Sequence, residues 1–255
     1  MSVQSCAEAV RRADEDRFLS TMTMPAAARP LLFTLYAFNL EVSRAPIAAR
    51  EPMIAQMRLQ WWRDALGEIA EGDIVRQHET VAPLAAELRA HGLDARDLLP
   101  VIDARERDIM PQPFAGLPDL RAYLEATAGT LAVVAGAGLG SGDARPEDLR
   151  GAASAGAAAR FLCALAPLAA QGVQPLGPDP RDAIVELAQG ALSDLEAARR
   201  IRFGPATGVL RAFWTAPVLL DQAVRDPDAA IEGRLGLAEF RRRGSLLVKA
   251  VAGRW

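Results

Sequence analysis

Apolar residues recur at intervals of three and four along almost the whole chain, and no stretch alternates long enough to predict a strand. The pattern therefore predicts an all-α protein. Clusters of proline and glycine at residues 110–118, 138–146 and 171–180 predict connections between helices. A chain of 255 residues without a fixed-period repeat predicts one domain over residues 1–255. The expected helices cover residues 4–20, 25–45, 51–71, 79–91, 94–108, 118–137, 146–170, 181–202, 206–225 and 236–252.

The segment RLQWWRDALGEIAEGD, residues 58–73, is the most distinctive of these helices. Gly72 stands where a left-handed glycine commonly ends a helix. Trp62, Arg58 and Arg63 fall outside the apolar stripe of this helix. Because tryptophan and arginine commonly anchor interfaces, we expect Trp62 and Arg63 to contact a partner. The stripe itself predicts a core-facing surface made by Met57, Trp61, Ala65 and Ile69.

Two segments raise the question of membrane contact. Residues 151–170 are apolar enough to span a bilayer, but Arg160 lies in their middle and predicts a buried core helix instead. The basic C-terminal segment, residues 241–255, predicts a helix docked on the core, with contact to a membrane surface or a partner as the alternative. One face of that helix is apolar and holds Leu246, Leu247, Ala250 and Val251.

Composition excludes some classes of partner. A net charge of −3 and a pI near 5.6 give no basic excess of the kind that binds nucleic acid. Cys6 and Cys163 are the only cysteines, which predicts neither a disulfide framework nor a thiolate zinc site. The first residues lack the order of a secretory signal, so we expect a cytoplasmic protein. His78 and His91 belong to no catalytic motif, and we expect both to be solvated.

Five segments together carry a resemblance to a known family. They are YAFN at 36–39, the Trp61-Trp62 region ending at Gly72, DARERD at 103–108, YLEATAGTLAVVAGAGLG at 123–140 and the small-residue helix at 151–167. In this order they resemble squalene and phytoene synthases. The resemblance implies an isoprenoid-synthase-type helical bundle around a central cavity. In active members two aspartate-rich segments face each other across the cavity and hold magnesium, which binds the diphosphates of two prenyl substrates.

The first aspartate-rich segment is not preserved in this chain. Tyr36 and the two residues after it match the family pattern, and Asn39 follows them. Glu41, the nearest carboxylate, stands three residues before Arg44, where the two side chains are expected to pair. Pro46 interrupts the helix where an active enzyme has its last ligand. The positions of the three acids hold Ser43, Arg44 and Ile47.

The second aspartate-rich segment is also missing, since no Asp or Glu occurs between Asp148 and Asp179. A third region keeps more of the pattern. Asp103 and Asp108 match acid positions of the family, and Tyr123 matches the helix that lines the cavity. Two acids five residues apart point away from each other on a helix, so they make a poor metal site by themselves. Their alternative role is as structural carboxylates beside neighbouring arginines.

This pattern of loss resembles a divergent branch of the family that includes a mitochondrial assembly factor for respiratory complex I. That branch also has Ala-Phe-Asn followed by Glu and Arg, and an Arg-Leu-Gln-Trp-Trp-Arg segment like residues 58–63 here. The resemblance implies a non-catalytic protein without a cofactor that binds a protein partner, such as a complex I subunit. It also allows an isoprenoid or lipid ligand and a peripheral position at the inner membrane surface.

Two alternatives stay open. One is a prenyltransferase that condenses two isoprenyl diphosphates head to head, with a reduced magnesium site made by Glu41, Asp103 and Asp108. In that enzyme the diphosphates would be bound directly by arginine, whose planar guanidinium matches phosphate oxygens, and the candidates are Arg44, Arg58 and Arg160. The other alternative is a binding protein for isoprenoids or quinones that catalyses nothing.

Overall fold

The computed structural model describes residues 2–48, 51–72 and 76–255, and within these ranges it contains helices and no strand, which confirms the all-α prediction. Short 3-10 turns are η1 (Ala26–Ala28), η2 (Ala95–Leu98), η3 (Arg105–Ile109), η5 (Gly204–Ala206) and η6 (Arg211–Phe213). The α-helices are α1 (Val3–Ala13), α2 (Glu15–Met22), α3 (Arg29–Arg44), α4 (Pro52–Glu71), α5 (Val81–Ala90), α6 (Leu99–Ala104), α7 (Leu117–Leu124), α8 (Thr130–Leu139), α9 (Pro146–Ala170), α10 (Arg181–Ala198), α11 (Thr207–Leu210), α12 (Ala216–Arg225), α13 (Asp228–Ile231) and α14 (Glu239–Val251).

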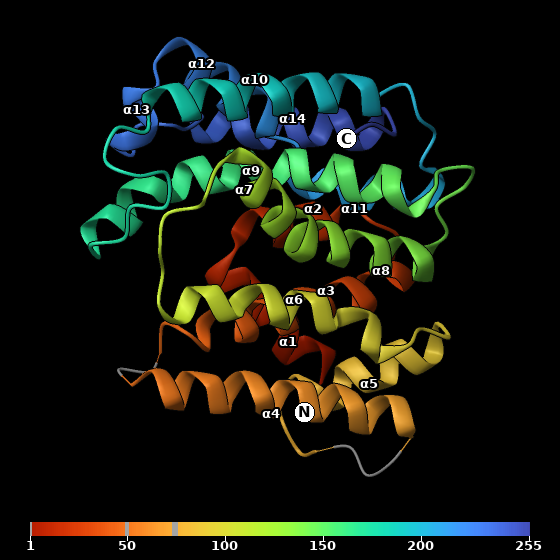
Figure 1. Cartoon of the computed structure of the whole chain (residues 1–255). Helices are drawn as coiled ribbons and strands as arrows, with labels where there is room; N and C mark the ends of the chain where they lie inside the picture. Colours follow the sequence, from red (N-terminus) through yellow and green to blue (C-terminus); the bar gives the residue numbers. More distant parts are fainter. Residues whose placement is uncertain (1, 49–50, 73–75) are drawn as a thin grey trace.

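Helix α9 lies in the middle of the bundle (Figure 1). It packs against α10 and α12 on one side and against α8 on the other. Helix α3 packs against α1 and α5, and α4 lies at the far side of the bundle from α10. A single hydrophobic cluster of buried residues extends from Cys6 to Ala230. The residues discussed below therefore lie on helices that share one core.

The small residues of α9 bring its neighbours close to its backbone. Residues 152–159 are all buried. A Cβ atom built on Gly156 would lie 2.5 Å from Cγ of Phe213, so the Phe213 ring occupies the space that any larger residue would need. Gly151, five residues earlier on the same helix, has nothing within 4 Å of a Cβ atom built in the same way. Close packing, rather than an empty cavity, follows from the glycine at position 156.

Several predicted helices are interrupted. Asp14 has a non-helical conformation, φ −148° and ψ 79°, and separates α1 from α2 within the predicted helix 4–20. Its side chain accepts a hydrogen bond from the backbone N–H of Arg17 at 2.9 Å, so it caps α2. The predicted helix 94–108 is a short α-helix between two 3-10 segments, and the predicted helix 206–225 is divided into α11, η6 and α12. Gly72 closes α4 with φ 81°, as predicted.

A π-helical turn, η4 (Glu125–Gly129), joins α7 to α8. The backbone N–H of Thr130 donates to the carbonyl of Glu125, five residues earlier. Arg150 of α9 lies against this turn, and its Nη1 donates to the Thr130 hydroxyl at 3.0 Å. The turn therefore fixes α8 against α9.

Two helical segments are long and apolar enough to cross a membrane by length and composition, Leu117–Leu139 and Pro146–Ala170. In each, 56% of the apolar window is buried inside the protein, and core helices of soluble proteins pass the same test. The prediction of a buried core helix around Arg160 is confirmed, because residues 152–159 just before it are enclosed by neighbouring helices.

The core face of α4 differs from the prediction. Met57 is 65% exposed, whereas Trp62, which we expected at the surface, is 4% exposed. The Trp62 ring packs edge-on against Phe38 with ring centroids 5.4 Å apart. Trp61 is only half-buried. Two stripes with helical spacing overlap on this helix. Packing on η2, α6 and η3, together with the contact between Trp62 and Phe38, buries the stripe that holds Ala55, Leu59, Trp62, Ala65, Leu66 and Ile69.

Candidate functional site

A central polar cluster joins α2, α3 and α9. Its acid is Asp14, the N-cap of α2, which forms a hydrogen-bonded ion pair with Nη1 of Arg160. Nη2 of Arg160 donates to the carbonyl of Ala212 at 3.1 Å. Burial opposes the charge on Arg160, but Asp14 and Asp16 outweigh it and raise the Arg160 pKa. Arg160 is thus held by the protein itself rather than left free for a diphosphate.

Arg17 is the member of this cluster whose hydrogen-bonding capacity is least used. Its guanidinium lies 4.9 Å from the centre of the Tyr36 ring, and its Nε is 3.6 Å from the Asp14 carboxylate. That Nε is buried without a hydrogen-bond partner. Burial lowers the pKa of Arg17, and burial also raises the pKa of the Tyr36 phenol. The pair therefore presents a cation and a neutral phenol to the interior of the bundle.

A second part of the cluster lies where η3 meets α7. The Tyr123 hydroxyl donates to Oδ2 of Asp108 at 2.8 Å. Arg105 donates to the same carboxylate oxygen at 3.1 Å and also contacts the Tyr123 hydroxyl. Burial, and then Asp108, raises the pKa of Tyr123 although Arg105 opposes the shift. Asp108 is consequently occupied by two protein donors. Nε of Arg105 is buried without a partner.

Asp103 lies apart from this cluster, on the surface. Its side chain is 59% exposed and forms an ion pair with Nη2 of Arg63 at 2.8 Å. Glu106 binds the same nitrogen at 2.6 Å. Arg63, which we expected to contact a partner, therefore joins α4 to the η3 region. Asp103 and Asp108 do not share a site, as their spacing on one helix indicated.

Three further predicted residues, Glu41, Arg44 and Arg58, line one surface groove of about 580 Å³. We call it the α3–α4 groove, and its other described walls include Trp61, Trp62 and His78. The ion pair expected between Glu41 and Arg44 is not among the salt bridges of the residues that the structure describes. His78 is half-buried, with its ring centroid 5.2 Å from that of Trp61, so it is not simply solvated as expected.

Exposed apolar side chains occur in and near the α3–α4 groove in sequence, and of these Ile54 and Met57 line it. Ile47, which stands at an acid position of the family, is 68% exposed. Met53 and Met57 are 69% and 65% exposed, and Ile54 is 43% exposed. Asn39, also predicted as a site residue, is instead buried on α3 at 6% exposure. The corner between α3 and α4 therefore presents an apolar and cationic surface.

Sequence reasoning missed Arg17 and Asp14. Both lie in a charged stretch, RRADEDRF, that resembles an ordinary solvated helix face. The one available signal was the Asp-x-x-Arg spacing, which is typical of a helix cap followed by a first-turn residue. Only the break at Asp14 turns these two side chains inward.

The model of the squalene/phytoene synthase family matches residues 10–166 of the chain. The chain belongs to this family. Among solved structures, this family member is similar to a dehydrosqualene synthase in complex with ligand, with a TM-score of 0.74 and 12% identity over 98% of this chain and 95% of that one. It is also similar to a squalene synthase from Alicyclobacillus acidocaldarius, with a TM-score of 0.71 and 16% identity over 92% and 95% of the two chains. These likenesses confirm the predicted isoprenoid-synthase-type fold.

The curated relatives of this family member include NADH dehydrogenase (ubiquinone) complex I, assembly factor 6, from Bos taurus. The two are 31% identical over 130 residues, which cover 49% of this chain and 38% of that protein. The homolog from Drosophila melanogaster is 34% identical over 132 residues, which cover 49% and 39% of the two chains. The chain thus spans about two fifths of the length of the curated relatives it matches.

The side chains of this family member do not fit the magnesium that the family implies. Magnesium requires several oxygen ligands in near-octahedral geometry. Here Asp108 is bound by Arg105 and Tyr123, Asp103 lies outside, and Arg44 occupies an acid position. Within residues 2–48, 51–72 and 76–255, no three His, Cys, Asp or Glu side chains are grouped so that they could hold a metal ion.

Proposed function

We propose that this protein is a non-catalytic member of the squalene/phytoene synthase family that acts as an assembly factor for a respiratory complex I-like enzyme. The observation that carries the proposal is the α3–α4 groove, where Arg44, at the position of a magnesium-binding acid, lines the groove beside Ile54 and Met57, and the exposed Ile47, at another such position, follows it in the chain. A cationic, apolar corner repels a divalent ion. It suits contact with a protein, because exposed apolar side chains beside arginine are typical of interfaces.

The names of the curated relatives support the identity of the partner as a component of complex I assembly. We propose that this partner binds the α3–α4 groove, with Trp61 and Met57 in the contact and Trp62 as buried support below them. The predicted interface role of Arg63 is not retained, since both of its nearby acids already bind it. We expect the protein to act in the cytoplasm at the inner membrane surface.

The central cluster supports an accessory role for a small ligand. The unpartnered Nε atoms of Arg17 and Arg105 leave hydrogen-bonding capacity inside the bundle. An isoprenoid or lipid with a polar head would use that capacity without a metal ion. This supports retention of a ligand rather than turnover of one.

The test uses a strain that lacks the gene and carries plasmid-borne variants of the full chain. Ile54→Glu with Met57→Glu puts two acids on the groove, and Val218→Glu, at a 45% exposed position on α12, is the matched control. We expect the wild type and the control to restore NADH-driven quinone reduction, and the groove variant to restore less than a tenth of it. Full restoration by the groove variant would remove the groove from the proposal.

The prenyltransferase alternative is decided by a separate measurement on the purified protein. Magnesium and farnesyl or geranylgeranyl diphosphate are added, and coupled hydrocarbon and pyrophosphate are quantified. We expect neither product above the level of a protein-free control. Formation of the coupled hydrocarbon with release of two pyrophosphates per molecule would overturn the non-catalytic proposal, whatever the deletion strain shows.

A further inference from the structure

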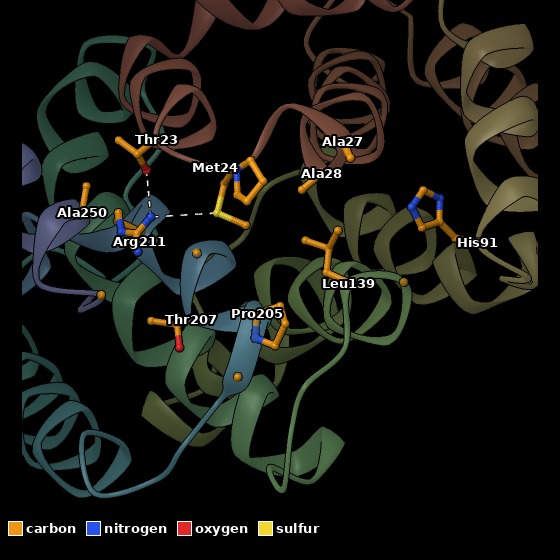
Figure 2. Close-up of a pocket in the computed structure, with 15 residues that line it drawn as sticks. Thr23, Met24, Ala27, Ala28, His91, Leu139, Pro205, Thr207, Arg211 and Ala250 are labelled. Carbon is orange, nitrogen blue, oxygen red and sulfur yellow. Dashed lines mark hydrogen bonds between the residues drawn. The ribbon is translucent and has the colours of Figure 1, made fainter.

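A second pocket lies at the opposite end of α3 from the α3–α4 groove (Figure 2). It measures about 490 Å³, and its walls come from the α2–α3 connection, His91 at the end of α5, the end of α8, the segment from η5 to η6 and the end of α14. Because α3 has 16 residues, the two sites are about 24 Å apart along its axis. The pocket is therefore distinct from the α3–α4 groove.

Arg211 enters this pocket from η6 and is only 6% exposed. Its Nη1 donates to the Thr23 hydroxyl at 2.8 Å and lies 3.9 Å from the sulfur of Met24, as Figure 2 shows. Its Nε donates to the carbonyl of Arg254 at 3.0 Å. Among the described residues, its Nη2 donates to no protein atom and no carboxylate forms a salt bridge with it.

This situation sets Arg211 apart from the other enclosed arginines. Arg160 and Arg105 each pair with an aspartate, at Asp14 and Asp108. Burial lowers the pKa of Arg211, and no nearby charge raises it again. Buried charges in proteins are normally paired. A guanidinium that keeps two N–H groups toward a pocket therefore lacks an anion.

The rest of the pocket is consistent with a negative group near Arg211. None of its lining residues is acidic. Ala27 and Ala28 place the N-terminal end of α3 at the pocket, and the first turn of that 16-residue helix has no acidic residue and no side-chain cap. The positive end of a helix dipole favours an anion. The remaining walls are mostly apolar, with Met24, Leu139 and Pro205 among them.

Size and lining indicate the chemistry of the ligand. Pockets of this volume with apolar walls and few polar groups are typical of small-molecule sites. A single unpaired guanidinium matches one negative charge, and the apolar walls match a hydrocarbon chain. We infer that this pocket binds an amphiphile with one negatively charged head and an apolar chain, with the head on Arg211. The head could belong to a free fatty acid or to an acidic lipid of a bilayer.

The end of α14 connects the pocket to the protein surface. Ala250 lines the pocket, and its helix neighbours Leu247 and Val251 are 65% and 83% exposed. An apolar chain that leaves the pocket would therefore meet apolar surface. The pocket shares no lining residue with the α3–α4 groove or with the central cluster.

Calorimetry on the protein of residues 1–255 compares dodecanoate with dodecanol, which has the same chain without the charge. We expect the wild type to bind dodecanoate at least tenfold more tightly than dodecanol. Arg211→Met should remove this preference, and Ala250→Phe, which narrows the pocket and replaces none of the hydrogen-bond partners of Arg211, should weaken the binding of both ligands. Arg225→Met, at an exposed ion pair of α12, is the control and should match the wild type.

The outcome that overturns the inference is dodecanoate binding by both pocket variants within twofold of the wild type. If Arg211→Met does not fold by near-UV circular dichroism, Ala250→Phe alone decides.

Sedimentation with vesicles identifies the source of the amphiphile. Arg211-dependent binding to phosphatidylglycerol vesicles, but not to phosphatidylcholine vesicles, supports a bilayer lipid. Arg211-dependent binding of dodecanoate alone supports a free fatty acid. Vesicle binding that ignores Arg211, with no dodecanoate binding, contradicts the pocket.

Discussion

Replacing Asp14 with asparagine removes one negative charge from the interior while it keeps the cap of α2. Asparagine caps helices as well as aspartate does, so the hydrogen bond from the Arg17 N–H is retained. The loss is the ion pair with Arg160, whose two side chains are 14% and 30% exposed. Breaking a largely buried pair by removing one partner costs about 3–5 kcal/mol. Because Arg160 keeps its bond to the carbonyl of Ala212, we expect the low end, about 3 kcal/mol.

Urea unfolding followed by circular dichroism measures this loss. With a slope of about 3 kcal/mol per molar urea, the midpoint should fall by about 1 M. The difference should also depend on pH. Burial opposes ionisation of Asp14, but Arg160 and Arg17 outweigh burial and lower its pKa below 3.8. A lowered acid pKa contributes stability that is present above the unfolded-state pKa and is lost as pH falls through the folded-state pKa. The gap between wild type and variant should therefore narrow below pH 3.8.

An exposed ion pair supplies the matched control. Asp221 and Arg225 lie one turn apart on α12, with side chains 47% and 76% exposed. Asp221→Asn should cost no more than about 0.5 kcal/mol, because such pairs are screened by water. If Asp14→Asn costs no more than this control, the ion pair between α2 and α9 does not stabilise the fold, and the reasoning about the central cluster is refuted.

Two other changes test the packing and the charges of the bundle. Gly156→Ala should destabilise the protein by about 1–3 kcal/mol in thermal unfolding, because the new methyl group overlaps the Phe213 side chain. Gly151→Ala, in open space on the same helix, should stabilise the protein by up to about 1 kcal/mol. Equal stability of the two variants would contradict the close packing at Gly156. Burial, and then Arg199, lowers the pKa of Lys249 in the folded state from 10.5 to about 8. Between these pH values Lys249 is protonated in the unfolded state and neutral in the folded state, so the free energy of unfolding should rise with pH. The melting temperature of the wild type, measured relative to Lys249→Met, should increase over that pH range, and a constant difference would show that Lys249 is solvated.

The helical class followed from the sequence because apolar periodicity reports directly on local structure. Periodicity did not decide which face of α4 is buried. Trp61 and Trp62 are adjacent, and the two apolar stripes to which they belong share Ala65 and Ile69. The contact between Trp62 and Phe38 selects one stripe, and that contact joins residues that are distant in sequence. A local pattern contains no information about such a partner.

The candidate site was predictable in part. The resemblance to the family located Tyr36, Asp108 and Tyr123. In the structure Tyr36 lies against Arg17 in the central cluster, and Tyr123 donates to Asp108 in the second part of that cluster. Arg17 was not predictable from its spacing, because its inward position depends on the break at Asp14 and on the ring of Tyr36 beneath its guanidinium. Asp103 matches the family as well as Asp108 does, yet the two side chains point to different environments because the helix turns between them.

The π-helical turn at residues 125–129 allows the chain to hold one extra residue between α7 and α8. A turn closed by a bond to the fifth residue back holds about one residue more than an α-helical turn, so the side chains before and after it keep the facing of one continuous helix. Deleting one residue here should therefore restore regular α-helix while Tyr123 and Leu131 still face their present neighbours. The residue type is restricted instead, because a Cβ atom on Gly129 would lie 2.7 Å from Cγ of Arg150. A stretch that looks like an ordinary apolar helix in the sequence should therefore tolerate the loss of one residue better than a side chain at position 129.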